Sequence, residues 1–304
     1  MLAVIHRHTP PRGTGALALA GPPVVIRQLQ WLHDLGSERV AIELGQDERG
    51  ERVRRLVTEQ KVLSRGVVFV PAATPLSPRA LGETAGFPAE ARWLALPESV
   101  VGNADLTRLF RRRSIEGTLV GRLTPPKTGG PFSPAEVHLT GPSSGPVTVE
   151  SLPGWGTLIE TPDTALQLAC EALLGRLSLL LHAAETRPGV WVARGARIDD
   201  GAELRPPVLI GARARVCGQA RVGPGVLIGS RALIEPRARL EQALVEDDTI
   251  VGEGLVVREH IATPWGLIPL KAGSDLLPQP EPLLAARRAS LLPARLTHLL
   301  RIPS

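Results

Sequence analysis

Aliphatic side chains recur every six residues in the C-terminal half of the chain. The members of this series are Val192, Ile198, Leu204, Ile210, Val216, Val222, Ile228, Ile234 and Leu240. A second series of small or branched apolar residues follows four positions after these anchors, as at Ala196, Ala214 and Ala232. A three-sided coil needs an inward aliphatic on each side and a small residue near each corner. The pattern therefore predicts a left-handed parallel β-helix of hexapeptide repeats.

The six-residue period slips by one position after Leu240 and then resumes as Val245, Val251 and Val257. A slip of this kind indicates a small irregularity at one corner of the coil. We therefore expect about four turns that end near Ile261.

The first 180 or so residues carry a different pattern, in which short apolar runs alternate with longer amphipathic segments. This alternation favours an α/β domain with a mainly parallel, Rossmann-like sheet and helices on both of its faces. Strands are predicted at 2–6, 40–44, 67–70 and 93–96, and an antiparallel hairpin at 136–139 and 147–152. Helices are predicted after Pro23, over 47–60, after Ser77 and after the N-cap residue Thr161.

Three domains follow from these patterns. Residues 1–183 form the α/β domain, 184–270 the β-helix, and 271–304 a Pro/Gly-rich linker with a basic amphipathic helix around Leu283–Leu292. We expect this last helix to pack on its own β-helix or on a sister subunit, and we do not expect it to associate with a membrane.

The composition is that of an ordinary globular protein, with 43% hydrophobic and 21% charged residues. No apolar run is long enough to span a membrane, and the first residues do not resemble a signal peptide, so we expect a cytoplasmic protein. The net charge is +5, and the positive charges are almost all arginines. Because these arginines are not interleaved with aromatic residues, nucleic acid is not an expected partner.

Three segments of the first domain resemble one known family. They are LAVIH with the later ALALAGPPVVIRQLQWLHDLGSERVAIEL, then RWLALPESVVGNADLTRLF, and then WGTLIETPDTALQLACEALLG. Together with the following repeat, they are similar to the sugar-1-phosphate nucleotidylyltransferases, or NDP-sugar pyrophosphorylases, including mannose-1-phosphate guanylyltransferases. The resemblance implies a nucleotidyltransferase-like domain that works in nucleotide-sugar or polysaccharide metabolism.

The catalytic motifs of that family are degenerate in this chain. The phosphate-binding loop is shortened to HRHTPPRGTG, and the resemblance places nucleotide binding at Arg12, Gly13, Thr14 and Gly15. Thr14 stands where the family has a lysine, which leaves Arg7 and Arg12 as the candidate catalytic cations of the loop.

The metal-binding aspartates of the family fall at Ser99 and Leu158. The nearby Glu98 and Glu160 are therefore the candidate catalytic carboxylates and metal ligands. They would hold Mg²⁺ if the chain is active, because nucleotidyl transfer needs a divalent cation to offset phosphate charge.

Three hypotheses follow. The first is a weakly active or non-catalytic relative that binds a sugar nucleotide or sugar phosphate, either as a homo-oligomer or as the partner of an active paralogue. The second is an active nucleotidylyltransferase with a rearranged site. The third is a hexapeptide-repeat acyltransferase, in which His260 acts as the general base and acetyl-CoA binds between coils.

Overall fold

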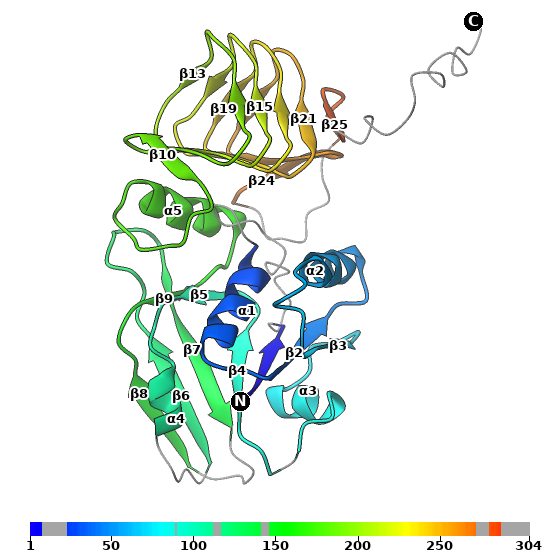
Figure 1. Cartoon of the computed structure of the whole chain (residues 1–304), viewed down its shortest axis with the longest axis vertical. Coiled ribbons are helices and arrows are strands. Elements are labelled where there is room, and N and C mark those ends of the chain that lie inside the picture. The colour runs from blue at the N-terminus through cyan, green and yellow to red at the C-terminus, as the bar shows by residue number, and fades with distance from the viewer. Residues whose placement is uncertain (8–22, 89, 112–116, 141–145, 272–279, 287–304) are drawn as a thin grey trace, which may run out of the picture. The chain divides into compact units, whose positions relative to one another are not determined.

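The structure is a computed structural model of the 304-residue chain, and it describes residues 1–7, 23–88, 90–111, 117–140, 146–271 and 280–286 (Figure 1). The chain forms two compact units. The first consists mainly of Met1–Ala172 and the second mainly of Leu181–Leu270. None of the described helices is long and apolar enough to cross a membrane.

The first unit is a mixed α/β structure built on one large sheet. Its strand order is β3-β2-β1-β4-β7-β6-β8, with the short strands β5 and β9 paired off this path. Strands β3, β2, β1 and β4 are mutually parallel. The elements are β1 (Leu2–His6), α1 (Val24–Asp34), β2 (Arg39–Leu44), α2 (Glu48–Glu59), β3 (Val67–Pro71), α3 (Pro78–Thr84), β4 (Trp93–Pro97), β5 (Val100–Gly102), α4 (Thr107–Arg111), β6 (Thr118–Leu123), β7 (Ser133–Thr140), β8 (Val147–Ser151), β9 (Gly156–Leu158) and α5 (Pro162–Leu173).

Both faces of the parallel strands are buried, because successive side chains point to opposite sides of a sheet. Ile5 belongs to a core cluster that includes α1 and the α2 residue Val57, whereas its neighbour Val4 belongs to a cluster that includes Leu81 of α3. Helices therefore cover both faces, as the alternating pattern predicts. The predicted cap Ser77 is confirmed, since its hydroxyl oxygen accepts the N–H of Ala80 at 3.2 Å.

The predicted hairpin between residues 136–139 and 147–152 is wrong. Strand β7 pairs antiparallel with β6, and β8 lies on the other side of β6, parallel to it. The sequence analysis did not predict β6, although TLVGRL carries a short apolar run. This third strand takes the place between the two expected hairpin strands, and local patterns do not reveal such an insertion.

The second unit is a three-sided parallel coil (Figure 1). Its sheets have the orders β10-β11-β14-β17-β20-β23-β24, β12-β15-β18-β21-β25 and β13-β16-β19-β22. The aliphatic anchors from Ile210 to Leu240 lie inside, each with at most 2% of its surface exposed. The strands are β10 (Ala184–Arg187), β11 (Val190–Val192), β12 (Arg197–Ile198), β13 (Glu203–Leu204), β14 (Val208–Ile210), β15 (Arg215–Val216), β16 (Arg221–Val222), β17 (Val226–Ile228), β18 (Leu233–Ile234), β19 (Arg239–Glu241), β20 (Ala243–Val245), β21 (Thr249–Val251), β22 (Val256–Arg258), β23 (His260–Thr263), β24 (Gly266–Pro269) and β25 (Leu284–Ala286).

The predicted slip of the period is confirmed in the register. Ile210 pairs with Ile228, eighteen positions later, but Ile228 pairs with Val245, only seventeen positions later. The corner that loses a residue contains Gln242, which has a left-handed backbone conformation with φ of 45°. The parallel coil is thus observed, and its left-handedness stays a prediction.

Corners of the coil use left-handed backbone conformations. The non-glycine residues that adopt them are Arg213, Gln219, Arg231, Arg237, Gln242, Asp248 and Glu259. Several directly precede a buried small residue, as Arg213 precedes Ala214. This conformation is uncommon outside glycine, and here it turns the chain so that the next side chain enters the core.

The C-terminal helix predicted around Leu283–Leu292 is wrong in its described part. Leu284–Ala286 forms strand β25, which pairs antiparallel with β21. No further coil follows β21 in this sheet, and an open strand edge is readily covered by another strand. Leu284 also enters the coil core, with 7% of its surface exposed. The rest of the predicted linker and helix, 272–279 and 287–304, lies outside the described residues.

The inward and outward sides of β18 offer a direct test of the coil core. Ile234 is fully buried, whereas its neighbour Leu233 is partly exposed. We expect Ile234→Ala to lower the free energy of unfolding by about 2–5 kcal/mol, because it leaves a cavity. The matched Leu233→Ala should lower it by about 1 kcal/mol or less. Denaturant unfolding followed by circular dichroism measures both, and equal losses would contradict this orientation.

Candidate functional site

The succession of parallel strands reverses at β1. The chain places β2 and β3 on one side of β1 and then returns to place β4 on the other side. Open α/β sheets bind ligands at the carboxyl ends of the strands beside such a switch point. His6 ends β1 and pairs in register with Pro97, which ends β4. The carbonyl oxygen of His6 then accepts the backbone N–H of Glu98 at 2.8 Å.

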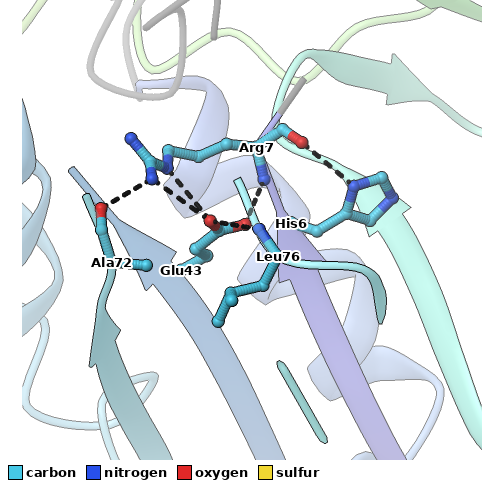
Figure 2. Close-up of polar contacts among 5 residues, drawn as sticks. All are labelled: His6, Arg7, Glu43, Ala72 and Leu76. Carbon is cyan, nitrogen blue, oxygen red and sulfur yellow. Dashed lines mark hydrogen bonds and ion pairs between the residues drawn. The ribbon is translucent and has the colours of Figure 1, made fainter. Parts of the chain in front are cut away.

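Glu43 is the central polar group at this end of the sheet (Figure 2). Its side chain is fully buried on β2, beside the end of β1. Its Oε2 accepts the backbone N–H of Arg7 at 2.9 Å, and its Oε1 accepts both Nε and Nη2 of the Arg7 guanidinium at 3.2 Å. The backbone N–H of Leu76 also donates to Oε1, at 2.9 Å.

Arg7, a candidate catalytic cation, is held from two sides. Besides its bonds to Glu43, its Nη2 donates to the carbonyl oxygen of Ala72 at 2.7 Å, just beyond β3. Its side chain is 9% exposed. The ion pair thus ties together the ends of β1, β2 and β3. Sequence reasoning missed Glu43, although an acidic residue in the apolar run VAIEL was a signal that a buried partner exists.

Glu98 and Glu160 lie just outside two neighbouring strands, before β5 and after β9. Strands β5 and β9 pair antiparallel, with Val100 opposite Leu158, and the N–H of Ile159 donates to the carbonyl oxygen of Ser99 at 2.8 Å. Glu98 directly precedes Ser99 and Glu160 directly follows Ile159, so the two glutamates flank this hydrogen bond. The Oε2 of Glu160 accepts the hydroxyl of Ser133 at 3.0 Å.

The turn that carries Glu98 and Ser99 is fixed from α1. The side-chain Nε2 of Gln28, which is buried, donates to the carbonyl oxygens of Pro97 at 2.7 Å and of Val100 at 3.0 Å. These two acceptors flank the turn. Because buried polar groups need partners, one amide side chain both satisfies two carbonyls and holds the turn against the helix.

Two histidines lie near the same strands. Burial lowers the pKa of His6, whose Nδ1 lies 3.2 Å from the carbonyl oxygen of Arg7. Burial also lowers the pKa of His138, which pairs in register with Ala95 of β4. A neutral imidazole can accept or donate a proton through either ring nitrogen, so His6 adds a polar group to the site that sequence reasoning did not assign.

The remaining predicted residues of this domain are not placed. Arg12, Gly13, Thr14 and Gly15 lie in 8–22, outside the described residues. Among the residues that the structure describes, no group of three or more His, Cys, Asp and Glu side chains has a metal-binding arrangement. A Mg²⁺ site at Glu98 and Glu160 would therefore rest on two protein carboxylates.

His260, the candidate acyltransferase base, begins β23 on the last turn of the coil. Its Nδ1 lies 2.5 Å from the carbonyl oxygen of Arg258, so the ring is tied to its own chain on one side. His260 also pairs with Pro269 of the adjacent antiparallel strand β24. Its role as a general base stays a prediction.

Comparisons with known proteins assign no family. No protein-family model matches the chain, and no curated protein matches it. Among solved structures, the chain is similar to HddC from Yersinia pseudotuberculosis, complexed with GMP-PN, with 12% identity and a TM-score of 0.41. The match covers 56% of this chain and 98% of HddC. Because the identity and the TM-score are this low, the function has to be argued from the geometry of the site.

The buried Arg7–Glu43 ion pair should contribute strongly to the free energy of unfolding. We expect Glu43→Ala to lower the free energy of unfolding by about 3–5 kcal/mol, because it leaves the buried guanidinium uncompensated. Glu136→Ala removes the exposed pair with Arg122 and should change stability by about 1 kcal/mol or less. Denaturant unfolding measures both variants. Similar effects of the two would show that the Glu43 carboxylate is not a structural clamp.

The buried His6 predicts a pH dependence of stability. Because its pKa is lowered in the folded state, the unfolded chain binds a proton first as the pH falls through about 6.5. Stability is therefore lost as the pH falls below that value. We expect His6→Gln to flatten this dependence between about pH 7.5 and 5.5, as measured by thermal unfolding. An unchanged slope would exclude His6 as a contributor.

Proposed function

We propose that the chain binds a sugar nucleotide or sugar phosphate at the carboxyl ends of β1 and β4, as a weakly active or non-catalytic relative of the sugar-1-phosphate nucleotidylyltransferases. The observation that carries this proposal is the ion pair between Arg7 and the buried Glu43. Nucleotidyl transfer needs cations that face the phosphates. Here the Nε and Nη2 donors of Arg7 are taken by a carboxylate and a carbonyl of its own chain.

Ligand binding at this place is supported by the strand order. The switch point between β1 and β4 is where an open α/β sheet takes its ligand, and the Glu98–Ser99 turn stands directly beside it. The turn is held rigid by Gln28, so its groups are positioned before a ligand arrives. A ligand can therefore bind there even when the side chains needed for catalysis are missing.

A second candidate function, active nucleotidyl transfer, is favoured by the positions of Glu98 and Glu160, which flank the hydrogen bond between Ile159 and Ser99. Magnesium sites often use one or two protein carboxylates and complete their coordination with substrate phosphates. Glu98 and Glu160 would hold Mg²⁺ in this case, and the metal would offset charge on the phosphate oxygens. Gln28 would then keep Glu98 in place while the substrate binds.

Thermal shift and calorimetry on the purified full-length chain test the proposal. With Mg²⁺ present, we expect one NDP-sugar or sugar-1-phosphate to stabilise the protein, by about 2.7 kcal/mol at a hundred times its Kd. Glu98→Gln should change this binding, whereas Glu136→Gln, on the exposed side of β7, should not. Pyrophosphate release should stay below about 1 s⁻¹, the lower end of ordinary turnover.

The outcomes separate the hypotheses. Binding without turnover agrees with the proposal. Ordinary turnover that is lost in both Glu98→Gln and Glu160→Gln would establish the active enzyme instead. Stabilisation by acetyl-CoA alone would move the function to the coil and His260, and no response to any of these ligands would refute a nucleotide or sugar-phosphate site.

A further inference from the structure

Arginines gather on the outer face of one sheet of the coil, β13-β16-β19-β22. In register, one outward row runs through Glu203, Arg221, Arg239 and Val256. The neighbouring row contains Glu241, which pairs in register with Arg258. A hollow of about 250 Å³ lies on this face, and its lining residues are Arg205, Arg221, Gly223, Arg239, Leu240, Glu241, Val256, Val257 and Arg258.

Gly223 is the only glycine among the residues that line the hollow. Gly223 follows β16, and its N–H donates to the carbonyl oxygen of Leu240 on the next coil. A Cβ at this position would lie only 1.9 Å from the carbonyl oxygen of Arg205, and φ of 104° is strained for any other residue. The close packing of the coil therefore requires glycine here, and the Arg205, Arg221 and Arg239 side chains line the hollow beside it.

The charges around the hollow do not balance. Glu203 is shared by Arg205 at 2.6 Å and Arg221 at 3.3 Å, and Glu241 pairs with Arg258 at 2.7 Å. Arg239 has no carboxylate partner among the described residues, although it stands next to Arg221 in register. Four guanidinium groups therefore face two carboxylates. Neighbouring strands are about 4.8 Å apart, so the Arg221–Arg239 contact is repulsive unless an anion lies between them.

Elsewhere on the coil, several arginines pair with a carboxylate of a neighbouring turn. Arg231 pairs with Asp248, Arg237 pairs with Glu253, and Arg215 pairs with Asp199. Arg197 is the most informative comparison. It stands in register with another arginine, Arg215, but it is not among the residues that line the hollow. The surplus of positive charge and the open space therefore coincide on the face that carries Gly223.

We propose that this hollow binds the phosphate group of a small phosphorylated molecule, in a site separate from the one at β1 and β4. Guanidinium groups recognise phosphate through paired, charge-assisted hydrogen bonds, and Arg221 and Arg239 supply two such groups side by side. The volume suits a compact ligand rather than a larger one. Val256, which is 53% exposed at the edge of the hollow, offers the ligand an apolar contact. This inference does not depend on the proposed nucleotide site.

Glu203 competes with the ligand for the same arginines. Its hydrogen bond from Arg205 lowers the pKa of its carboxyl group, so the carboxylate stays ionised as the pH falls. Removing that charge would release both Arg205 and Arg221 toward a phosphate. The glutamate therefore provides a variant that should strengthen binding, which a merely non-specific loss of structure could not do.

Calorimetry at constant ionic strength tests the proposal on the full-length chain, with glucose 6-phosphate as the probe and glucose as the uncharged control. We expect saturable binding of glucose 6-phosphate only. Arg221→Gln and Arg239→Gln should each weaken it by about tenfold or more. Arg197→Gln should leave it unchanged, and Glu203→Gln should tighten it. Circular dichroism confirms that each variant retains the coil.

Several outcomes would overturn the proposal. They are the absence of saturable binding, an equal loss in Arg197→Gln, or weaker binding in Glu203→Gln. Heparin that binds more tightly than glucose 6-phosphate and is equally sensitive to Arg197→Gln would instead indicate a diffuse polyanion surface. Glu98→Gln should not affect the glucose 6-phosphate titration, so failure here and failure of the proposed nucleotide site can be told apart.

Discussion

The buried carboxylate of Glu43 sets a condition that the first unit has to meet. An ionised group without water is strongly unfavourable unless it is paired and hydrogen-bonded. Glu43 meets this requirement with two backbone N–H groups and the Arg7 guanidinium, which come from the end of β1 and from the segment after β3. The chain leaving the central strand is thereby fixed beside the switch point.

The same interaction is the basis of the proposal that this site binds a ligand with little or no catalysis. Arg7 stands at the end of β1, where a cation for phosphate would be useful, yet two of its donor nitrogens are directed into the protein. On the coil the situation is reversed. Four arginines there share two carboxylates around a hollow, and Arg239 has no carboxylate partner among the described residues. In the first unit the Arg7 charge holds strand ends together, whereas we propose that the arginines of the coil bind a ligand.

The regular repeat allowed the coil to be predicted from the sequence. Nine aliphatics in six-residue register and one slip after Leu240 are local features, and each turn of a coil repeats the environment of the turn before it. The rows of charged residues on the coil depend on which residues stack eighteen positions apart, and Gly223 is needed where its backbone packs against Arg205 of the turn before. The register is enough to derive these rows of charged residues. The hollow beside them can be recognised only from the three-dimensional structure.

The sequence by itself determined the parallel strands and helix caps of the first unit, the repeat, and its slip, because spacing and capping chemistry are properties of neighbouring residues. Only the tertiary structure decided that β6 separates β7 from β8, and that Leu284 covers the open edge of β21 as a strand. It also joined Arg7 to Glu43, and it bonded Ile159 to Ser99, beside Glu160 and Glu98. These contacts link residues that are distant along the chain. Which residues pair depends on the order of the strands in the sheet and on burial, and no local sequence pattern encodes either of these.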